Sequence, residues 1–152
     1  MNKKKLKKMP IVDIQIRDKH FWRLVRPKAF CQQVILSAWA GDSNAEISVV
    51  LADNDFVHKL NKQYRGKDKP TNVLSFENEG LCAGDIVVAY GVLVREAKEQ
   101  KKSFRSHLAH LLVHGTLHLQ GYDHLNDKQA RKMESLETKI MQKLGYPDPY
   151  KE

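Results

Sequence analysis

Four short stretches in which apolar residues alternate with polar ones or cluster together predict β-strands. The first two are IVDIQI at residues 11–16 and EISVVL at residues 46–51. The other two are VLSF at residues 73–76 and DIVVAY at residues 85–90, separated by the segment ENEGLCAG. All four precede the helical stretches of the C-terminal part, so they can assemble into one small sheet.

Apolar residues that recur every three or four positions predict five helices. Pro27 lies near the start of the first, where a helix tolerates proline, and either Asp53 or Asn54 caps the second. Gly121 stops the fourth, because glycine commonly follows the last turn of a helix. The helices are expected over residues 27–40, from 53 or 54 to about 64, and over about 92–101, 104–119 and 127–144.

Apolar faces on two of these helices identify candidate core residues. The face of the second helix consists of Phe56, Val57, Leu60 and Tyr64. The face of the last helix consists of Met133, Leu136, Ile140 and Leu144. Together, strands and helices predict an α+β fold, with a small mixed sheet of about four strands packed by about five helices in a single domain.

The expected domain spans residues 11–148 and follows a basic, flexible tail at residues 1–10. The tail, MNKKKLKKMP, has the charge of a signal-peptide start, but charged residues interrupt the apolar run that a signal peptide needs next. No uncharged apolar run reaches the roughly 18 residues of a membrane-spanning helix. A soluble, cytoplasmic protein without a membrane partner is therefore expected.

The charge balance adds a class of partner to this picture. Lys and Arg number 26 against 18 Asp and Glu, and the formal net charge is +8. Such an excess favours nucleic acid or an anionic membrane surface, and composition alone does not choose between them. The two cysteines, Cys31 and Cys82, form no Cys-x-x-Cys pattern and fit small buried residues in a reducing compartment.

Candidate chemistry is concentrated in the stretch HGTLHLQGYDH at residues 114–124. His114 and His118 are four residues apart, so they lie on one face of a helix within reach of one ion. The chain breaks at Gly121, which allows His124 to return toward that face. Three histidine ligands with an open fourth position are typical of a catalytic zinc site. His110 lies one turn earlier, but a tripod of 110, 114 and 118 would spread over two turns.

The residue after the first histidine argues against one class of zinc enzyme. Peptidases of the H-E-x-x-H type place a glutamate there to deprotonate water, whereas this chain has Gly115. Three neutral imidazoles also leave the full charge of the ion in place, which suits a Lewis acid acting on a phosphodiester. The pattern therefore favours phosphodiester hydrolysis over peptide hydrolysis.

A second candidate region is the basic segment LNKQYRGKDKPTNVLSF at residues 60–76. Lys62, Lys67 and Lys69 are candidate RNA-binding residues, although a solvated loop would have the same charge. Arg65 differs in kind, because its planar guanidinium can hold two phosphate oxygens at once. If this loop lies over the metal, Arg65 becomes the catalytic candidate that stabilises charge developing on the phosphate.

These segments resemble the YbeY family, bacterial single-strand-specific endoribonucleases that mature ribosomal RNA. The resemblance rests on the segments HGTLHLQGYDH, LNKQYRGKDKPTNVLSF, GDIVVAY and REAKEQ, and it extends from about Ile11 to Leu144. Two departures are small. Asn72 stands where aspartate is commoner, and Cys82-Ala83 precede Gly84 where leucine is usual.

The resemblance implies one zinc ion per chain held by His114, His118 and His124, with Arg65 needed for cleavage in a cleft between sheet and histidine helix. It also implies 16S rRNA 3′-end maturation and quality control of the small ribosomal subunit. The implied partners are single-stranded and ribosomal RNA, the small subunit and its assembly proteins.

Two other functions remain open on the sequence. One is a zinc hydrolase of another class, such as a peptidase. The other is a non-catalytic ribosome-assembly factor whose zinc is structural, which a fourth ligand from Asp123 or Asp85 would support. Asp123 is either an orienting partner of an imidazole or a turn residue.

Overall fold

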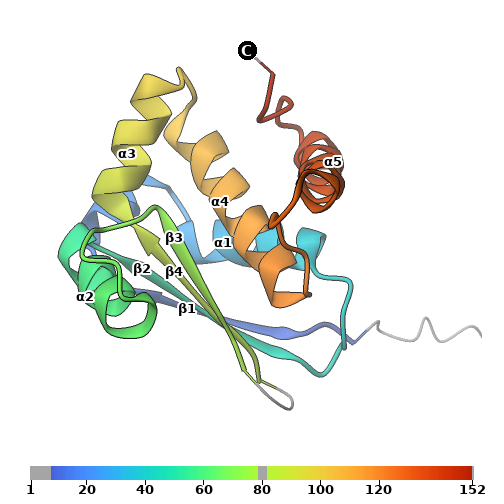
Figure 1. Ribbon diagram of the computed structural model, residues 1–152, viewed down its shortest axis with the longest axis horizontal. Coiled ribbons are helices and arrows are strands. Elements are labelled where there is room, and N and C mark those ends of the chain that lie inside the picture. Colours follow the sequence, from blue (N-terminus) through green and yellow to red (C-terminus); the bar gives the residue numbers. More distant parts are fainter. Residues whose placement is uncertain (1–7, 79–81, 152) are drawn as a thin grey trace, which may run out of the picture.

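The computed structural model describes residues 8–78 and 82–151 (Figure 1). Strands and helices are interspersed up to residue 89, and three α-helices follow. In chain order the elements are β1 (Ile11–Ile16), the 3₁₀ helix η1 (Lys19–Arg23), α1 (Pro27–Ala38), β2 (Glu46–Ala52), α2 (Asn54–Arg65), β3 (Val73–Glu77), β4 (Cys82–Ala89), α3 (Tyr90–Glu99), α4 (Phe104–Leu119) and α5 (Asp127–Lys143).

The four strands form one mixed sheet in the order β1-β2-β4-β3. β1, β2 and β4 are parallel, and β3 pairs antiparallel with β4. Parallel neighbours need a crossover connection, which α1 provides between β1 and β2. Since β3 occupies the edge beyond β4, the segment that links α2 to β3 lies at that edge of the sheet.

Helices cover both faces of the sheet, so its central strands are buried on both sides (Figure 1). On one face, α1, α4 and α5 enclose the main core, to which β2 contributes Ile47, Val49 and Leu51. On the other face α2 packs through Val57 onto a smaller cluster that includes Val87 of β4. The near-continuous apolar sequence of β2 and β4 follows from this double burial.

Helix α4 is the central element of the main core. It contacts β3, β4, α1, α3 and α5, and ten of its 16 residues are buried. Its N-terminus is capped by Ser103, whose Oγ accepts a 3.0 Å hydrogen bond from the Ser106 amide. A helix that is apolar nearly all round is typical of a buried position.

The α+β class, with a four-stranded mixed sheet and five α-helices among the described residues, is confirmed. Asp53 is the cap of α2, accepting from the Phe56 amide at 2.8 Å, while the Asn54 side chain instead accepts from the Val92 amide of α3. The expected strand end at Tyr90 is wrong, because that residue begins α3.

The expected apolar face of α2 is also wrong at its last position. The Tyr64 side chain is 62% exposed. The buried residue of that turn is Asn61, whose amide donates to the Lys69 carbonyl at 2.8 Å and so ties the basic loop to the helix.

Several expectations concern parts of the chain that the structure describes only partly. Most of the expected tail falls on residues 1–7, outside the described residues, so its division from the domain stays a prediction. Cys31 is buried as expected, and the side chain of Cys82 lies outside the description. Within residues 8–78 and 82–151, every helix is too short or too polar to cross a bilayer.

We expect Gly84, in strand β4, to tolerate substitution poorly. Its φ is +149°, and a Cβ there would lie 2.1 Å from the Phe76 carbonyl oxygen on β3. Gly84→Ala should lower the free energy of unfolding by about 3 kcal/mol, because backbone must move to relieve the clash. Urea denaturation measures this loss.

Gly66→Ala is the matched control. Gly66 also has a positive φ, +67°, but its Cβ would point into open space. Gly66→Ala should lower the free energy of unfolding by about 1 kcal/mol, from backbone strain alone. Equal losses in the two variants would contradict the steric explanation.

Candidate metal centre

Helix α4 brings His114 and His118 together through its four-residue repeat. The two Nε2 atoms are 3.0 Å apart, and the ring planes are nearly perpendicular. Both side chains lie on the part of α4 that faces a cavity rather than the core. The opposite sides of α4 are held against the sheet and α1, which fixes the backbone that carries both rings.

A tight turn returns His124 to the same place. Gly121 adopts a φ of +92°, and the amides of Gly121 and Tyr122 donate to the carbonyls of His118 and Leu117. This confirms that α4 ends where the sequence indicates. The His124 ring then lies 5.2 Å from the His118 ring, measured between centroids.

The three imidazoles fit a transition-metal ion such as zinc. One nitrogen from each ring lies within 4.8 Å of the others. Tetrahedral zinc holds imidazole nitrogens at about 2.0–2.1 Å, which places two of them about 3.3 Å apart. Burial, followed by the neighbouring His114 and His124, lowers the pKa of His118, which favours the neutral form that a ligand needs.

Among the residues that the structure describes, the candidate metal-binding group consists of the three histidines and includes no carboxylate. The Oδ1 atom of Asp123 accepts from the His124 amide at 2.8 Å and is 3.7 Å from that imidazole's Nδ1. Asp85 accepts a hydrogen bond from Asn78 instead. Asp123 thus contacts both the backbone and the imidazole of His124, and neither aspartate belongs to the described ligand group.

Glu137 of α5 is a site residue that the sequence reasoning missed. It is fully buried, and its Oε1 lies 2.8 Å from Nδ1 of His114. Burial raises the pKa of Glu137, but hydrogen bonds from His110, His114 and Tyr150 outweigh it and lower the pKa to about 2. The available signal was a glutamate between Met133 and Met141, at core spacing in the sequence.

His110 belongs to this carboxylate network rather than to the triad. Its Nε2 hydrogen-bonds to Oε2 of Glu137, and the Tyr150 hydroxyl donates to the same oxygen. Burial and the adjacent Glu137 raise the pKa of Tyr150, which keeps the hydroxyl protonated.

One turn earlier on α4, His107 is buried and bonded at 3.0 Å to Glu96 of α3. Asn72 donates to the same Glu96 oxygen, also at 3.0 Å. An ionised aspartate at position 72 would have no proton to donate to Glu96. Asparagine, which this chain has where aspartate is commoner, therefore suits a position next to that carboxylate.

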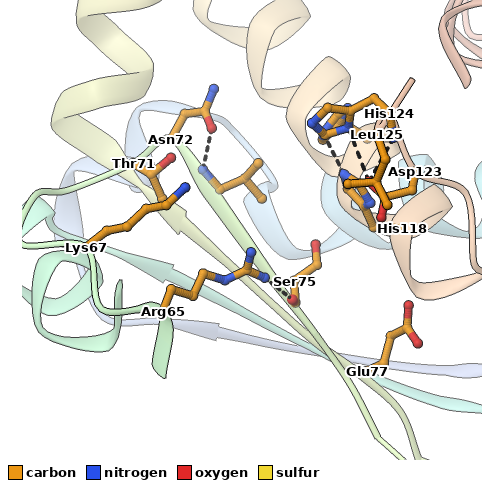
Figure 2. Close-up of a pocket in the computed structure, with 12 residues that line it drawn as sticks. Arg65, Lys67, Thr71, Asn72, Ser75, Glu77, His118, Asp123, His124 and Leu125 are labelled. Carbon is orange, nitrogen blue, oxygen red and sulfur yellow. Dashed lines mark hydrogen bonds and ion pairs between the residues drawn. The ribbon is translucent and has the colours of Figure 1, made fainter. Parts of the chain in front are cut away.

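The opposite wall of the cavity is formed by the end of α2, the basic loop and β3. The cavity has a volume of about 560 Å³, and both Arg65 and Lys67 line it together with the three histidines. Figure 2 shows Arg65 reaching toward Ser75, with His118 and His124 across the cavity. Nη2 of Arg65 donates to the Ser75 carbonyl at 2.8 Å, and the guanidinium lies 5.6 Å from the Phe76 ring centroid.

The other two lysines are placed differently. Lys62 and Lys69 are exposed but do not line this cavity, and Lys62 lies 3.9 Å from the Asp68 carboxylate. Of the four predicted basic residues, the fold thus brings Arg65 and Lys67 to the histidines and leaves Lys62 and Lys69 outside.

Gly115 lets α4 approach the sheet closely. A Cβ at this position would lie 3.1 Å from both the Ile86 side chain and the Ser75 hydroxyl. Position 115 therefore faces the sheet, and a side chain larger than glycine would press α4 away from it.

A histidine triad that faces an arginine across a polar cavity is typical of a hydrolase that uses a metal ion on an anionic substrate. Comparison with known proteins gives the family. The chain belongs to the endoribonuclease YbeY family, whose model matches residues 14–145.

Two relatives illustrate the match. An endoribonuclease YbeY of Methylocella silvestris is 43% identical over 153 positions, which cover 94% of this chain and 87% of that protein. The solution structure of TM1509 from Thermotoga maritima is similar with a TM-score of 0.59 and 28% identity. It covers 93% of this chain and 100% of that one.

Proposed function

We propose that this protein is a zinc-dependent endoribonuclease that cleaves single-stranded RNA in the cytoplasm, in 16S rRNA 3′-end maturation and quality control of the small ribosomal subunit. Family membership supports the reaction class. The observation that carries the proposal is the placement of Arg65 and the His114–His118–His124 triad in one cavity.

The three histidines would hold one zinc ion, each through one ring nitrogen. Bound there, zinc supplies Lewis acidity to a phosphodiester and helps to provide a nucleophile at neutral pH. The cavity polar groups orient the strand, and the open side of the triad leaves room for a phosphate.

Arg65 would stabilise charge that develops on the scissile phosphate. Its hydrogen bond to the Ser75 carbonyl fixes the guanidinium on β3, opposite the histidines. Arginine has five donors in a planar fork, so one can be spent on this anchor while others meet phosphate oxygens. A donor fixed before the substrate arrives needs no reorganisation during reaction.

The lysines would attract the phosphates of the RNA and would take no part in bond cleavage. Lys67 lines the cavity and would contact the strand near the cleaved bond, while exposed Lys62 and Lys69 would attract flanking phosphates. The ribosomal small subunit and its assembly proteins are the proposed partners that present this strand.

Two specific observations weigh against the alternatives. A peptidase of the H-E-x-x-H type has its catalytic glutamate directly after the first histidine, whereas this chain has Gly115 there. A purely structural zinc usually has four protein ligands, whereas the described cluster offers three.

The first test concerns the metal. Purified protein should contain about one zinc per chain, and His114→Ala, His118→Ala and His124→Ala should each lose most of it, because two imidazoles hold the ion poorly. Elemental analysis after dialysis measures the content. His20→Ala, an exposed histidine on η1, is the control. Full zinc content in His124→Ala would contradict the triad.

The second test concerns Arg65. Arg65→Lys keeps the charge but loses the fork, so single-turnover cleavage of single-stranded RNA should fall at least about tenfold, roughly 1.4 kcal/mol. Zinc content and RNA affinity should change little. Arg95→Lys, the same exchange on the exposed side of α3, should leave the rate unchanged. A wild-type rate in Arg65→Lys would remove Arg65 from catalysis.

The third test separates attraction from chemistry. Lys67→Ala should weaken RNA binding and flatten the salt dependence of log K by roughly 0.7 for the lost phosphate contact. Binding titrations over a range of salt concentrations measure this slope. Lys139→Ala, which removes an exposed charge on α5, should leave the slope unchanged. Identical slopes for Lys67→Ala and wild type would place Lys67 outside the RNA surface.

A further inference from the structure

Glu137 occupies a position where packing alone calls for an apolar side chain. It lies four residues from Met133 and from Met141 on α5, and all three are buried. Buried ionic groups seldom stabilise a fold more than an apolar residue of similar volume. A charge kept at this place therefore calls for a reason other than stability.

We propose that Glu137 is a positioning residue of the metal centre, which holds the His114 imidazole with Nε2 directed at the ion, and that Tyr150 of the C-terminal segment helps to fix that carboxylate. The inference rests on the proposed function only in taking His114 as a ligand. It adds two residues from α5 and the segment beyond it.

The hydrogen bond between Glu137 and His114 determines which ring nitrogen is available to a metal. An ionised carboxylate can only accept, so Nδ1 of His114, 2.8 Å away, must carry the proton. Nε2 then has its lone pair available, and this atom lies 3.0 Å from Nε2 of His118. Metal-bound histidines are commonly held in this way by a carboxylate, which also makes the imidazole a stronger donor.

The second oxygen of Glu137 is held just as firmly. The Tyr150 hydroxyl and Nε2 of His110 both bond to Oε2. With both oxygens engaged, the carboxylate cannot rotate away from His114. His110 thus contributes to the site through Glu137, although it is no member of the triad.

Three hydrogen bonds hold the segment that carries Tyr150 in place. The Asp148 carboxylate accepts from the Tyr150 amide at 2.9 Å and from the Thr138 hydroxyl of α5 at 3.2 Å. Nζ of Lys102 donates to the Pro149 carbonyl at 2.6 Å, which ties the segment to the connection between α3 and α4. The C-terminal segment is therefore anchored to two parts of the fold on either side of the network.

The main test is zinc affinity, measured by competition with a chromophoric chelator. Glu137→Gln preserves the shape of the side chain but removes its charge, and it should weaken zinc binding at least about tenfold. Glu134→Gln makes the same exchange three residues earlier on the exposed face of α5 and should match wild type. Equal affinity of Glu137→Gln and wild type would overturn the proposal.

Two further measurements keep the proposal testable if Glu137→Gln folds poorly. Tyr150→Phe keeps the charge and removes one bond to Oε2, so zinc affinity should fall about threefold. Affinity equal to or above wild type would exclude Tyr150 from the network. In ¹⁵N-histidine spectra of the metal-free wild type, His114 should carry its proton on Nδ1, and a proton on Nε2 would overturn the role of Glu137.

These outcomes are distinct from failure of the proposed function. If wild-type protein binds no zinc at all, the metal-dependent activity fails. If zinc binds tightly to wild type and equally to Glu137→Gln, the metal centre stands and only the positioning role is lost.

Discussion

The burial of α4 on nearly every side is the constraint on which the site depends. Its apolar residues face the sheet, α1 and α3, and its four histidines lie along one stripe. His107, His110, His114 and His118 follow one another along that stripe at helical spacing. A buried polar stripe needs partners, and the neighbouring helices α3 and α5 provide carboxylates for it.

The partners change from one end of the stripe to the other. His107 meets Glu96 of α3, and His110 meets Glu137 of α5. His114 is shared, with one nitrogen toward Glu137 and the other toward His118. The carboxylates therefore bond one ring nitrogen each of His107 and His110, while His114 and His118 line the cavity, where a cation is the partner that suits neutral imidazoles.

The cavity itself results from the meeting of two independent parts of the fold. One wall is α4 with the turn after it, and the other is the end of α2, which carries Arg65, with the loop and strand β3 that follow it. Gly115 sets their separation, because a residue without Cβ allows α4 to lie against Ser75 and Ile86. Secondary-structure elements on both sides would hold the groups of the proposed phosphate site with little reorganisation, as electrostatic stabilisation requires.

Local patterns were sufficient for much of this. The strands, the helices, the α+β class and the end of α4 at Gly121 follow from periodicity and turn chemistry, which neighbouring residues encode. The convergence of His114 and His118 follows from helix geometry alone. Tyr64 shows the limit of the method, since an amphipathic pattern does not reveal where the covering layer ends.

Tertiary structure decided the rest, because those contacts join residues that no local period relates. Glu137 is 23 positions from His114, and only the packing of α5 on α4 brings them together. Likewise, Lys62, Arg65, Lys67 and Lys69 lie within eight residues of the sequence, and only the tertiary structure placed Arg65 and Lys67, but not Lys62 or Lys69, on the cavity. The sequence by itself determined the elements and the triad, whereas long-range packing decided which charged groups meet it.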